Sequence, residues 1–254
     1  MYHKQRQIKK LNSYISAVEA FHVFSGEKDC AFLDSSLVND LGRYSIIGSE
    51  PYLKLVRDGD SFLINGQEET QISFEDYLRE YLRDHVDRNE SELPLVSGAV
   101  GYFSYDYGRK LQGVPSDEKD LVKIPDVVLT FYDVYIIEDC HKKETYLIAN
   151  GITEDASVKI REIEQKLWKK PEKKAEQKIP YDILVTPNFE KEEYKKAVDD
   201  MIHYIIEGDI YITNMTQQLT IESEKPPLDV FYDLRKNNPS PFGGYLDFGD
   251  YQIV

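Results

Sequence analysis

Cysteine and histidine side chains are the residues of this sequence that could bind a metal or attack a substrate. Five histidines are scattered along the chain with no partner at a zinc-binding spacing, and we interpret them as surface or core residues: His3, His22, His85, His141 and His203. Cys30 and Cys140 lie far apart and form no Cys-x-x-Cys motif. We therefore expect two buried, reduced thiols rather than a disulfide.

Glycines and carboxylates are the remaining candidates, for phosphate binding and acid–base chemistry. The sequence contains no phosphate-loop, dinucleotide-binding, serine-hydrolase or zinc-protease motif. Gly98 and Gly101 lie in an apolar segment, which is more typical of a β-bulge or close packing than of a phosphate cradle. No pair of carboxylates has the apolar surroundings that would raise a pKa. Residue types and spacing thus assign no catalytic, cofactor-binding or metal-binding residue to this chain.

The composition predicts a folded, acidic protein. The chain has 254 residues, of which 41% are hydrophobic, enough for one sizeable core or for one large domain with part of a second. Its 46 acidic against 31 basic residues give a net charge of −15, which argues against a nucleic-acid partner. No run of roughly 18 apolar residues occurs, so we expect no membrane span. The first residues lead into no apolar stretch and resemble no secretory signal, which favours a cytoplasmic protein.

Short apolar segments separated by turn residues predict an α+β fold with mainly antiparallel sheets and flanking helices. Helices are expected at 13–24, where Ser16 and Glu19 resemble a capping box, and from Ser73, where apolar residues repeat at helical spacing. Strands are expected at residues 30–33, 43–48, 52–56, 61–64, 96–105, 127–138 and 144–149.

The composition changes at Trp168, and this change predicts three parts. We expect an N-terminal β-rich domain at 1–168, a charged linker at 169–188 and the beginning of a second domain at 189–254. Basic residues in the linker could suggest nucleic-acid binding, but Glu172 and Glu176 interrupt them, which favours a solvated loop.

The second domain is expected to begin with a helix after Pro187, followed by a strand at 210–221 and a helix at 227–236. A final hairpin is expected to turn at Gly249-Asp250. Because the chain ends within this apolar hairpin, we interpret Val254 as a cut rather than a natural end.

Three segments together resemble the chorismate-utilising synthases. Leu33-Asp-Ser-Ser36 followed by Gly42-Arg-Tyr-Ser-Ile-Ile-Gly48 is similar to the family's N-terminal signature, and Gly98-Ala-Val-Gly-Tyr-Phe-Ser-Tyr-Asp-Tyr-Gly-Arg109 to its middle signature. The segments 208–219 and 237–245 resemble the opening of the chorismate-binding region. Their order and spacing agree along nearly the whole chain. The middle segment makes the chain most similar to the aminodeoxychorismate synthase (para-aminobenzoate synthase) component I branch, with anthranilate synthase component I as the alternative.

The resemblance implies a truncated fold of the anthranilate synthase component I type and a reaction that aminates chorismate. A glutamine amidotransferase subunit, component II, would supply ammonia, and the product would be 4-amino-4-deoxychorismate for para-aminobenzoate and folate synthesis. The family's catalytic residues and Mg²⁺ ligands lie beyond the segments matched here, so the resemblance places none of them in this chain. The 254 residues alone are therefore expected to be inactive, and a non-catalytic tryptophan-binding fragment is a further alternative.

The resemblance also implies a tryptophan pocket. Carried over position by position, it comprises Asp34, Ser35, Leu41, Gly42, Arg43, Tyr44, Pro241, Phe242 and Gly243. A carboxylate near the ligand's ammonium and hydroxyl or amide donors near its carboxylate would suit an amino acid. Phe32-Leu-Asp-Ser35 departs from the family's Leu-Leu-Glu-Ser by a shorter acid. The alternative is that Asp34 and Ser35 are polar residues at a strand end, with Ser35 a structural residue of the sheet, and that Phe242 belongs to the core.

Overall fold

The computed structural model describes residues 6–115, 122–169 and 183–254, which belong to two compact units. The first unit comprises 1–173 and 227–254, and the second comprises 174–226. The predicted second domain at 189–254 included 227–254, whereas here that segment belongs to the first unit, because β11 pairs with β2. The predicted linker lies largely outside the described residues, and near its end Leu184–Pro187 form a strand instead of a loop.

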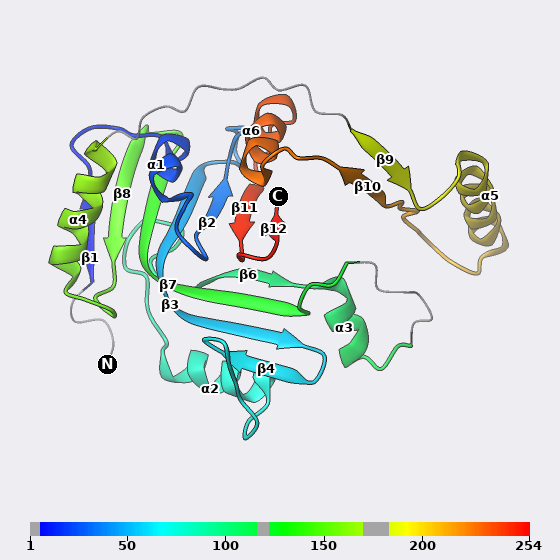
Figure 1. Cartoon of the computed structure of the whole chain (residues 1–254), viewed down its shortest axis with the longest axis horizontal. Coiled ribbons are helices and arrows are strands. Elements are labelled where there is room, and N and C mark those ends of the chain that lie inside the picture. Colours follow the sequence, from blue (N-terminus) through cyan, green and yellow to red (C-terminus); the bar gives the residue numbers. More distant parts are fainter. Residues whose placement is uncertain (1–5, 116–121, 170–182) are drawn as a thin grey trace. The chain divides into compact units, whose positions relative to one another are not determined.

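One antiparallel sheet organises the first unit (Figure 1). Its strand order is β1-β8-β7-β3-β2-β11-β12, with β6 on β7 and β4 and β5 extending from β3. The strands are β1 (Gln7–Lys10), β2 (Ala31–Asp34), β3 (Tyr44–Asp58), β4 (Ser61–Ile64), β5 (Gln67–Glu68), β6 (Ala99–Phe103), β7 (Val127–Asp139), β8 (Glu144–Ala149), β11 (Gly243–Asp247) and β12 (Gln252–Ile253). The predicted α+β class with antiparallel pairing is confirmed.

The two longest strands, β3 and β7, pair along nearly their whole length. The sequence predicted two strands where the structure has only β3, because Pro51 interrupts the alternation of apolar residues. Proline has no backbone N–H to donate, and the register between β3 and β7 shifts between Pro51 and Leu53. A β-bulge therefore carries the strand past the proline without ending it.

Helices cover the first unit's sheet. They are α1 (Ala17–Phe24), α2 (Phe74–Asp84), α3 (Tyr105–Leu111), α4 (Ala156–Trp168) and α6 (Pro227–Asn237). The capping box predicted for α1 is confirmed, because Ser16 accepts from the Glu19 backbone while Glu19 bonds back to Ser16. Sequence reasoning missed α3 and α4, although Ile160, Ile163 and Leu167 of α4 repeat at helical spacing and are buried.

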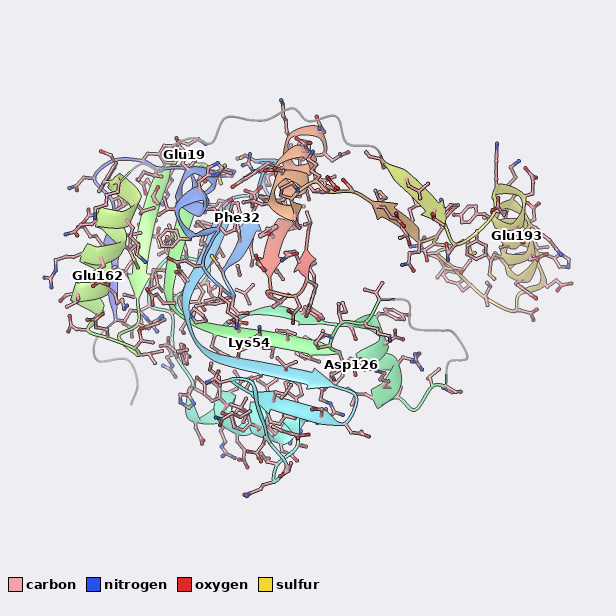
Figure 2. All side chains as sticks on the ribbon, viewed as in Figure 1. Glu19, Phe32, Lys54, Asp126, Glu162 and Glu193 are labelled. Atoms are coloured by element: carbon pink, nitrogen blue, oxygen red, sulfur yellow. The ribbon has the colours of Figure 1, made fainter. Side chains whose placement is uncertain are left out.

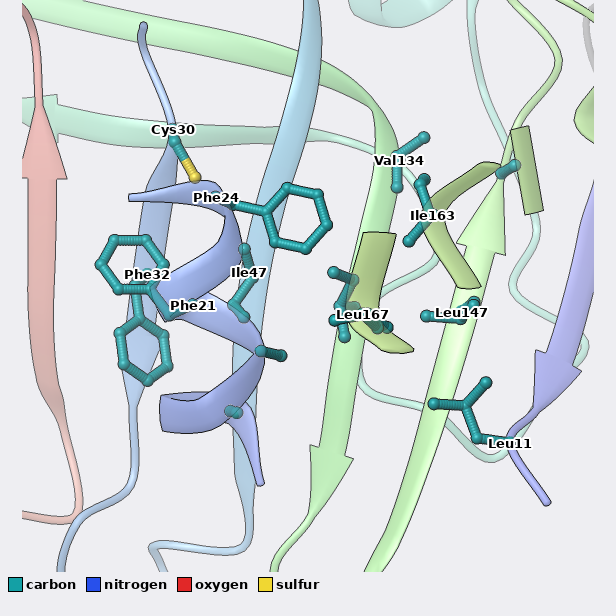
Figure 3. Packing of buried hydrophobic residues seen from close by; sticks show 14 of the residues in the cluster. Leu11, Phe21, Phe24, Cys30, Phe32, Ile47, Val134, Leu147, Ile163 and Leu167 are labelled. Atoms are coloured by element: carbon teal, nitrogen blue, oxygen red, sulfur yellow. The ribbon is translucent and has the colours of Figure 1, made fainter. Parts of the chain in front are cut away.

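The main hydrophobic core lies between the sheet and three of these helices, α1, α4 and α6. Figure 3 shows Phe21 and Phe24 of α1 facing the sheet beside Ile163 and Leu167 of α4. Successive residues of β7 point to opposite faces of the sheet and pack into different cores. Ile136 belongs to the main core, whereas its neighbours Tyr135 and Ile137 belong to a second cluster. Because β7 is buried on both faces, most of its residues are apolar, and its buried polar exceptions include Thr130 and Asp133. Charged side chains such as Glu162 cover the outer surface of α4 (Figure 2).

The second unit contains a hairpin and one helix. Strand β9 (Leu184–Pro187) pairs with β10 (Leu219–Glu222), and α5 (Lys191–Glu207) ends at Gly208, which has a left-handed φ of 86°. The helix predicted after Pro187 is confirmed. The strand predicted at 210–221 is wrong over most of its length, because only its last residues find a pairing strand. Among the described residues, no helix is both long and apolar enough to cross a bilayer.

Candidate functional site

Three segments that lie far apart in the sequence meet at the end of β2. This strand lies between β3 and β11, and the register places Gly243 opposite Asp34. The residue after the strand, Ser35, reaches both neighbours: its Oγ lies 2.7 Å from the Tyr44 carbonyl oxygen and 3.0 Å from the Pro241 carbonyl oxygen. The structure thus brings the two predicted halves of the pocket together.

Ser35 is a buried residue and not part of an exposed strand end. It is 6% exposed, and its backbone N–H donates to Ser45 Oγ at 3.0 Å. Its neighbour Ser36 forms a reciprocal pair with Ser240, accepting from that residue's N–H at 2.9 Å and donating to its carbonyl at 3.1 Å. These bonds fasten the segment before β11 to the end of β2, so both serines have a structural role in the protein without any ligand.

The loop between β2 and β3 is tightly folded against the segment before β11. Asn39 Oδ1 accepts from the backbone N–H groups of Leu41 and Gly42, at 2.9 and 2.8 Å. A Cβ at Gly42 would lie 2.3 Å from the Leu37 carbonyl oxygen and 3.0 Å from Pro241 Cα. Glycine is therefore required at this position because two backbone segments approach too closely for a side chain.

Asp34 is held by an arginine that sequence reasoning missed. Arg235 of α6 donates through Nε to Asp34 Oδ2 at 2.8 Å, and Ser45 Oγ lies 3.3 Å from the other carboxylate oxygen. Burial raises the pKa of Asp34 above its ordinary value, although Arg235 and Ser45 act in the opposite direction. Nothing in the helical pattern of 227–236 distinguishes this arginine from other exposed basic residues. A role for Asp34 toward a ligand's ammonium stays a prediction, and Arg235 already binds that carboxylate.

Arg43 and Tyr44 form the side of the site next to the end of β7. The Arg43 guanidinium lies 4.7 Å from the centre of the Tyr44 ring and donates to Asp139 Oδ2 at 2.7 Å. Burial acts to raise the pKa of Asp139, but hydrogen bonds from Arg43 and from the backbone N–H groups of His141 and Lys142 hold it below its ordinary value. Asp139 is therefore an ionised carboxylate that orients Arg43.

Apolar side chains are exposed beside these polar groups. Phe242 is 75% exposed and Leu41 is 69% exposed, and Leu37 and Val38 are also open to solvent. The alternative that Phe242 belongs to the core is wrong, because three quarters of its side chain is open to solvent. The arrangement can offer apolar contact and backbone carbonyl acceptors to a small molecule.

Potential metal ligands and reactive thiols were also candidates in the sequence. Among the described residues, no group of three or more histidine, cysteine, aspartate or glutamate residues could hold a metal ion. The predicted buried thiols Cys30 and Cys140 are confirmed as free, and burial raises the pKa of both. Close packing at Gly101 is also confirmed, since a Cβ there would lie 1.9 Å from the Val128 carbonyl oxygen. Mg²⁺ binding stays an expectation, and the family resemblance places its ligands beyond the segments matched in this chain.

The site runs from Asp34 at the end of β2 to Gly243 at the start of β11, and a match to a family model begins two residues after Asp34, at Ser36, and covers the site from that residue on. Residues 36–254 match the model of the chorismate binding enzyme family. The chain belongs to this family. Anthranilate synthase component 1 of Acetivibrio thermocellus is 30% identical over 249 residues, which cover 90% of this chain and 50% of that protein.

Two further comparisons describe the same relationship. Aminodeoxychorismate synthase component 1 of Bacillus subtilis is 28% identical over 232 residues, 84% of this chain and 47% of that protein. The crystal structure of anthranilate synthase component I from Streptococcus pneumoniae has the same fold, with a TM-score of 0.70 at 23% identity, over 94% of this chain and 55% of the other. The chain spans about half the length of the curated relatives that it matches. It is therefore a member of the chorismate-binding family with homologues among component I synthases of both kinds.

Proposed function

We propose that this chain is the N-terminal half of component I of an aminodeoxychorismate synthase. The whole protein would convert chorismate and ammonia from a glutamine amidotransferase subunit to 4-amino-4-deoxychorismate, for para-aminobenzoate and folate synthesis. Membership of the chorismate-binding family carries the proposal. The segment 98–109, which forms β6 and the start of α3, favours this branch by its resemblance, and the Bacillus subtilis relative is compatible with it.

Anthranilate synthase component I is the second candidate. The observation that favours it is the 30% identity to the Acetivibrio thermocellus protein, against 28% for the aminodeoxychorismate synthase of Bacillus subtilis. The reaction product separates the two candidates. Anthranilate synthase releases anthranilate directly, whereas 4-amino-4-deoxychorismate needs a lyase before an aromatic amine appears.

The deciding experiment uses the complete protein that carries these residues, with chorismate, Mg²⁺ and an ammonium salt. Chromatography with mass detection, with and without an added aminodeoxychorismate lyase, identifies the product. We expect para-aminobenzoate only when the lyase is present. Release of anthranilate without the lyase would instead establish the second candidate. The 254-residue chain in the same assay is expected to consume no chorismate above the uncatalysed rate.

The site at the end of β2 supports a second proposal, that it binds tryptophan. Its exposed apolar side chains, Leu41 and Phe242, could contact an indole, which buries roughly 150–250 Å² of surface. At about 25 cal/mol per Å² this is a gross gain of ~4–6 kcal/mol. The carbonyl oxygens of Tyr44 and Pro241, both near Ser35 Oγ, could accept from the ammonium.

A thermal unfolding experiment tests tryptophan binding. A ligand that binds only the folded state stabilises it by about 2.7 kcal/mol at a hundredfold excess over its Kd. We expect tryptophan to raise the unfolding temperature of the wild-type chain and to have no such effect on Phe242→Ala. Tyr105→Ala is the matched control, because Tyr105 is an exposed aromatic residue outside the site, at 94% exposure. An unchanged unfolding temperature for the wild-type chain with tryptophan would refute the proposal.

A further inference from the structure

A cavity of about 500 Å³ lies at the edge of the first unit's sheet, between β1 and the segment that joins α2 to β6. Its volume is in the range of small-molecule sites. β1 is the outermost strand, beside β8 (Figure 1). Its Ile8 lies opposite Ile148, which belongs to the second cluster, and Val96 on the other wall belongs to the same cluster. The cavity therefore has aliphatic walls on that face of the sheet.

Hydrogen bonds hold the walls of this cavity in place without a ligand. The Arg6 guanidinium donates through Nε to Oδ1 of Asn150, a buried residue directly after β8, at 2.7 Å, and it forms an ion pair with Asp87. The Asp87 carboxylate also accepts from Ser97 Oγ at 2.6 Å. These bonds fasten both sides of the cavity to the sheet. A preformed site of this kind loses less free energy to ordering when a ligand binds.

Two opposite charges line the same cavity without a partner. Arg88 and Glu90 both line it, and neither side chain forms a hydrogen bond or an ion pair with another described residue. Arg6 and Asp87, by contrast, are paired with each other. A guanidinium can bind a carboxylate through two parallel hydrogen bonds, and a carboxylate can accept from an ammonium group. The cavity thus presents one positive and one negative group to a ligand, beside aliphatic walls.

We propose that this cavity binds a free α-amino acid with an aliphatic side chain. Arg88 binds the ligand's carboxylate, Glu90 binds its ammonium group, and Ile8 and Val96 contact its side chain. A zwitterion has no net charge, so the field of a protein with a net charge of −15 does not repel it as it would a small anion. None of the described lining residues is aromatic, which favours an aliphatic side chain over an indole. The cavity shares no residue with the tryptophan site proposed above.

Magnetic resonance titration of the 254-residue chain with leucine and two analogues tests this inference. The analogues are 4-methylpentanoate, which lacks the ammonium group, and 3-methylbutylamine, which lacks the carboxylate. We expect leucine to bind with a Kd of about 1 mM or less, which a ligand of roughly nine non-hydrogen atoms can reach. Each analogue should bind at least tenfold more weakly, because it loses one charge-assisted hydrogen-bonding group. Amide hydrogens of β1 and of 87–97 should exchange more slowly with leucine present, and those of 34–44 should not change.

Two single variants assign the charged groups. Glu90→Gln should weaken leucine binding at least tenfold without weakening 4-methylpentanoate binding, because that analogue has no ammonium group. Arg88→Gln should weaken leucine binding to a similar extent without weakening 3-methylbutylamine binding. Glu80→Gln and Arg161→Gln, at exposed residues outside the cavity, are the matched controls and should bind leucine like the wild type.

Four results would overturn the inference. They are absence of leucine binding at about 10 mM, tenfold above the expected Kd, equal affinity for leucine and 4-methylpentanoate, unchanged leucine affinity of either cavity variant, or slower exchange at 34–44 and 241–243 instead of at the cavity. None of these results depends on the reaction product of the complete protein, so the inference can fail while the proposed function stands.

Discussion

Arg235 of α6 forms an ion pair with the buried carboxylate of Asp34 at the end of β2, with 2.8 Å between Nε and Oδ2, although the two residues are 201 positions apart in the sequence. The ion pair joins α6, which begins at Pro227, to β2, the strand that pairs with β11. A carboxylate at this depth is costly unless it is paired and hydrogen-bonded. The bond therefore links the docking of α6 directly to the geometry of the candidate site.

Arg235→Met is expected to lower the free energy of unfolding by about 3 kcal/mol, because it leaves a buried carboxylate without its cation. Chemical denaturation at neutral pH measures this loss. Lys236→Met is the control, since Lys236 is an exposed neighbour, and should change stability by less than about 0.5 kcal/mol.

The loss should also depend on pH. Burial raises the pKa of Asp34, and removing Arg235 takes away a partner that lowers it. A carboxyl group with a raised pKa binds its proton more tightly in the folded state, so its effect on stability becomes more unfavourable as pH rises through that pKa. The deficit of Arg235→Met should therefore be larger at pH 8 than at pH 5. An equal deficit at both pH values would contradict the role of Asp34.

Ser35→Ala is expected to destabilise the ligand-free protein by about 1–2 kcal/mol, because Ser35 is buried and its hydroxyl joins the start of β3 to the segment before β11. From the sequence alone, Ser35 would lie at an exposed strand end within a tryptophan pocket, and the substitution would be expected to cost little; its burial changes that expectation. Ser13→Ala, at an exposed serine, should leave the unfolding temperature unchanged. An unfolding temperature for Ser35→Ala within error of the wild type would show that the hydroxyl is not structural.

Two glycines of the site are expected to respond differently to alanine. A Cβ at Gly42 would lie 2.3 Å from a backbone oxygen, so Gly42→Ala should cost about 2 kcal/mol or more, through displacement of the loop. At Gly243 the nearest atom is the Asp34 carbonyl oxygen at 3.5 Å, an ordinary contact, and Gly243→Ala should cost less than about 1 kcal/mol. Denaturation curves of the two variants, measured in parallel, test this prediction. A larger loss of stability for Gly243→Ala than for Gly42→Ala would contradict it.

Asp139 is expected to contribute to stability above pH 4 and to lose this contribution in acid. Its pKa is lowered below the ordinary 3.8 in the folded protein, so the unfolded chain binds the proton more readily and stability falls as pH decreases through this range. Asp139→Asn should therefore be less stable at pH 7, by about 1–2 kcal/mol, and show a shallower decline between pH 5 and 3. Asp40→Asn, at an exposed aspartate, should keep the wild-type slope.

Local sequence predicted the elements whose signals are contained within a few residues. Ser16 and Glu19 began a helix as expected, and the hairpin around Gly249-Asp250 formed between β11 and β12. Prediction failed where a distant partner decides the outcome. The segment 210–218 lacks a strand to pair with, whereas Pro51 is carried within a strand because β7 runs beside it.

The sequence by itself determined the antiparallel α+β class, the reduced cysteines and the family resemblance, because these depend on residue types and short spacings. Only the tertiary structure decided that Ser35 is buried, that Arg235 binds Asp34, and that 227–254 packs with the first unit. Each of these depends on which strand lies beside β2. Strand order is set by the summed burial of the whole core, and no short segment of the chain carries that information.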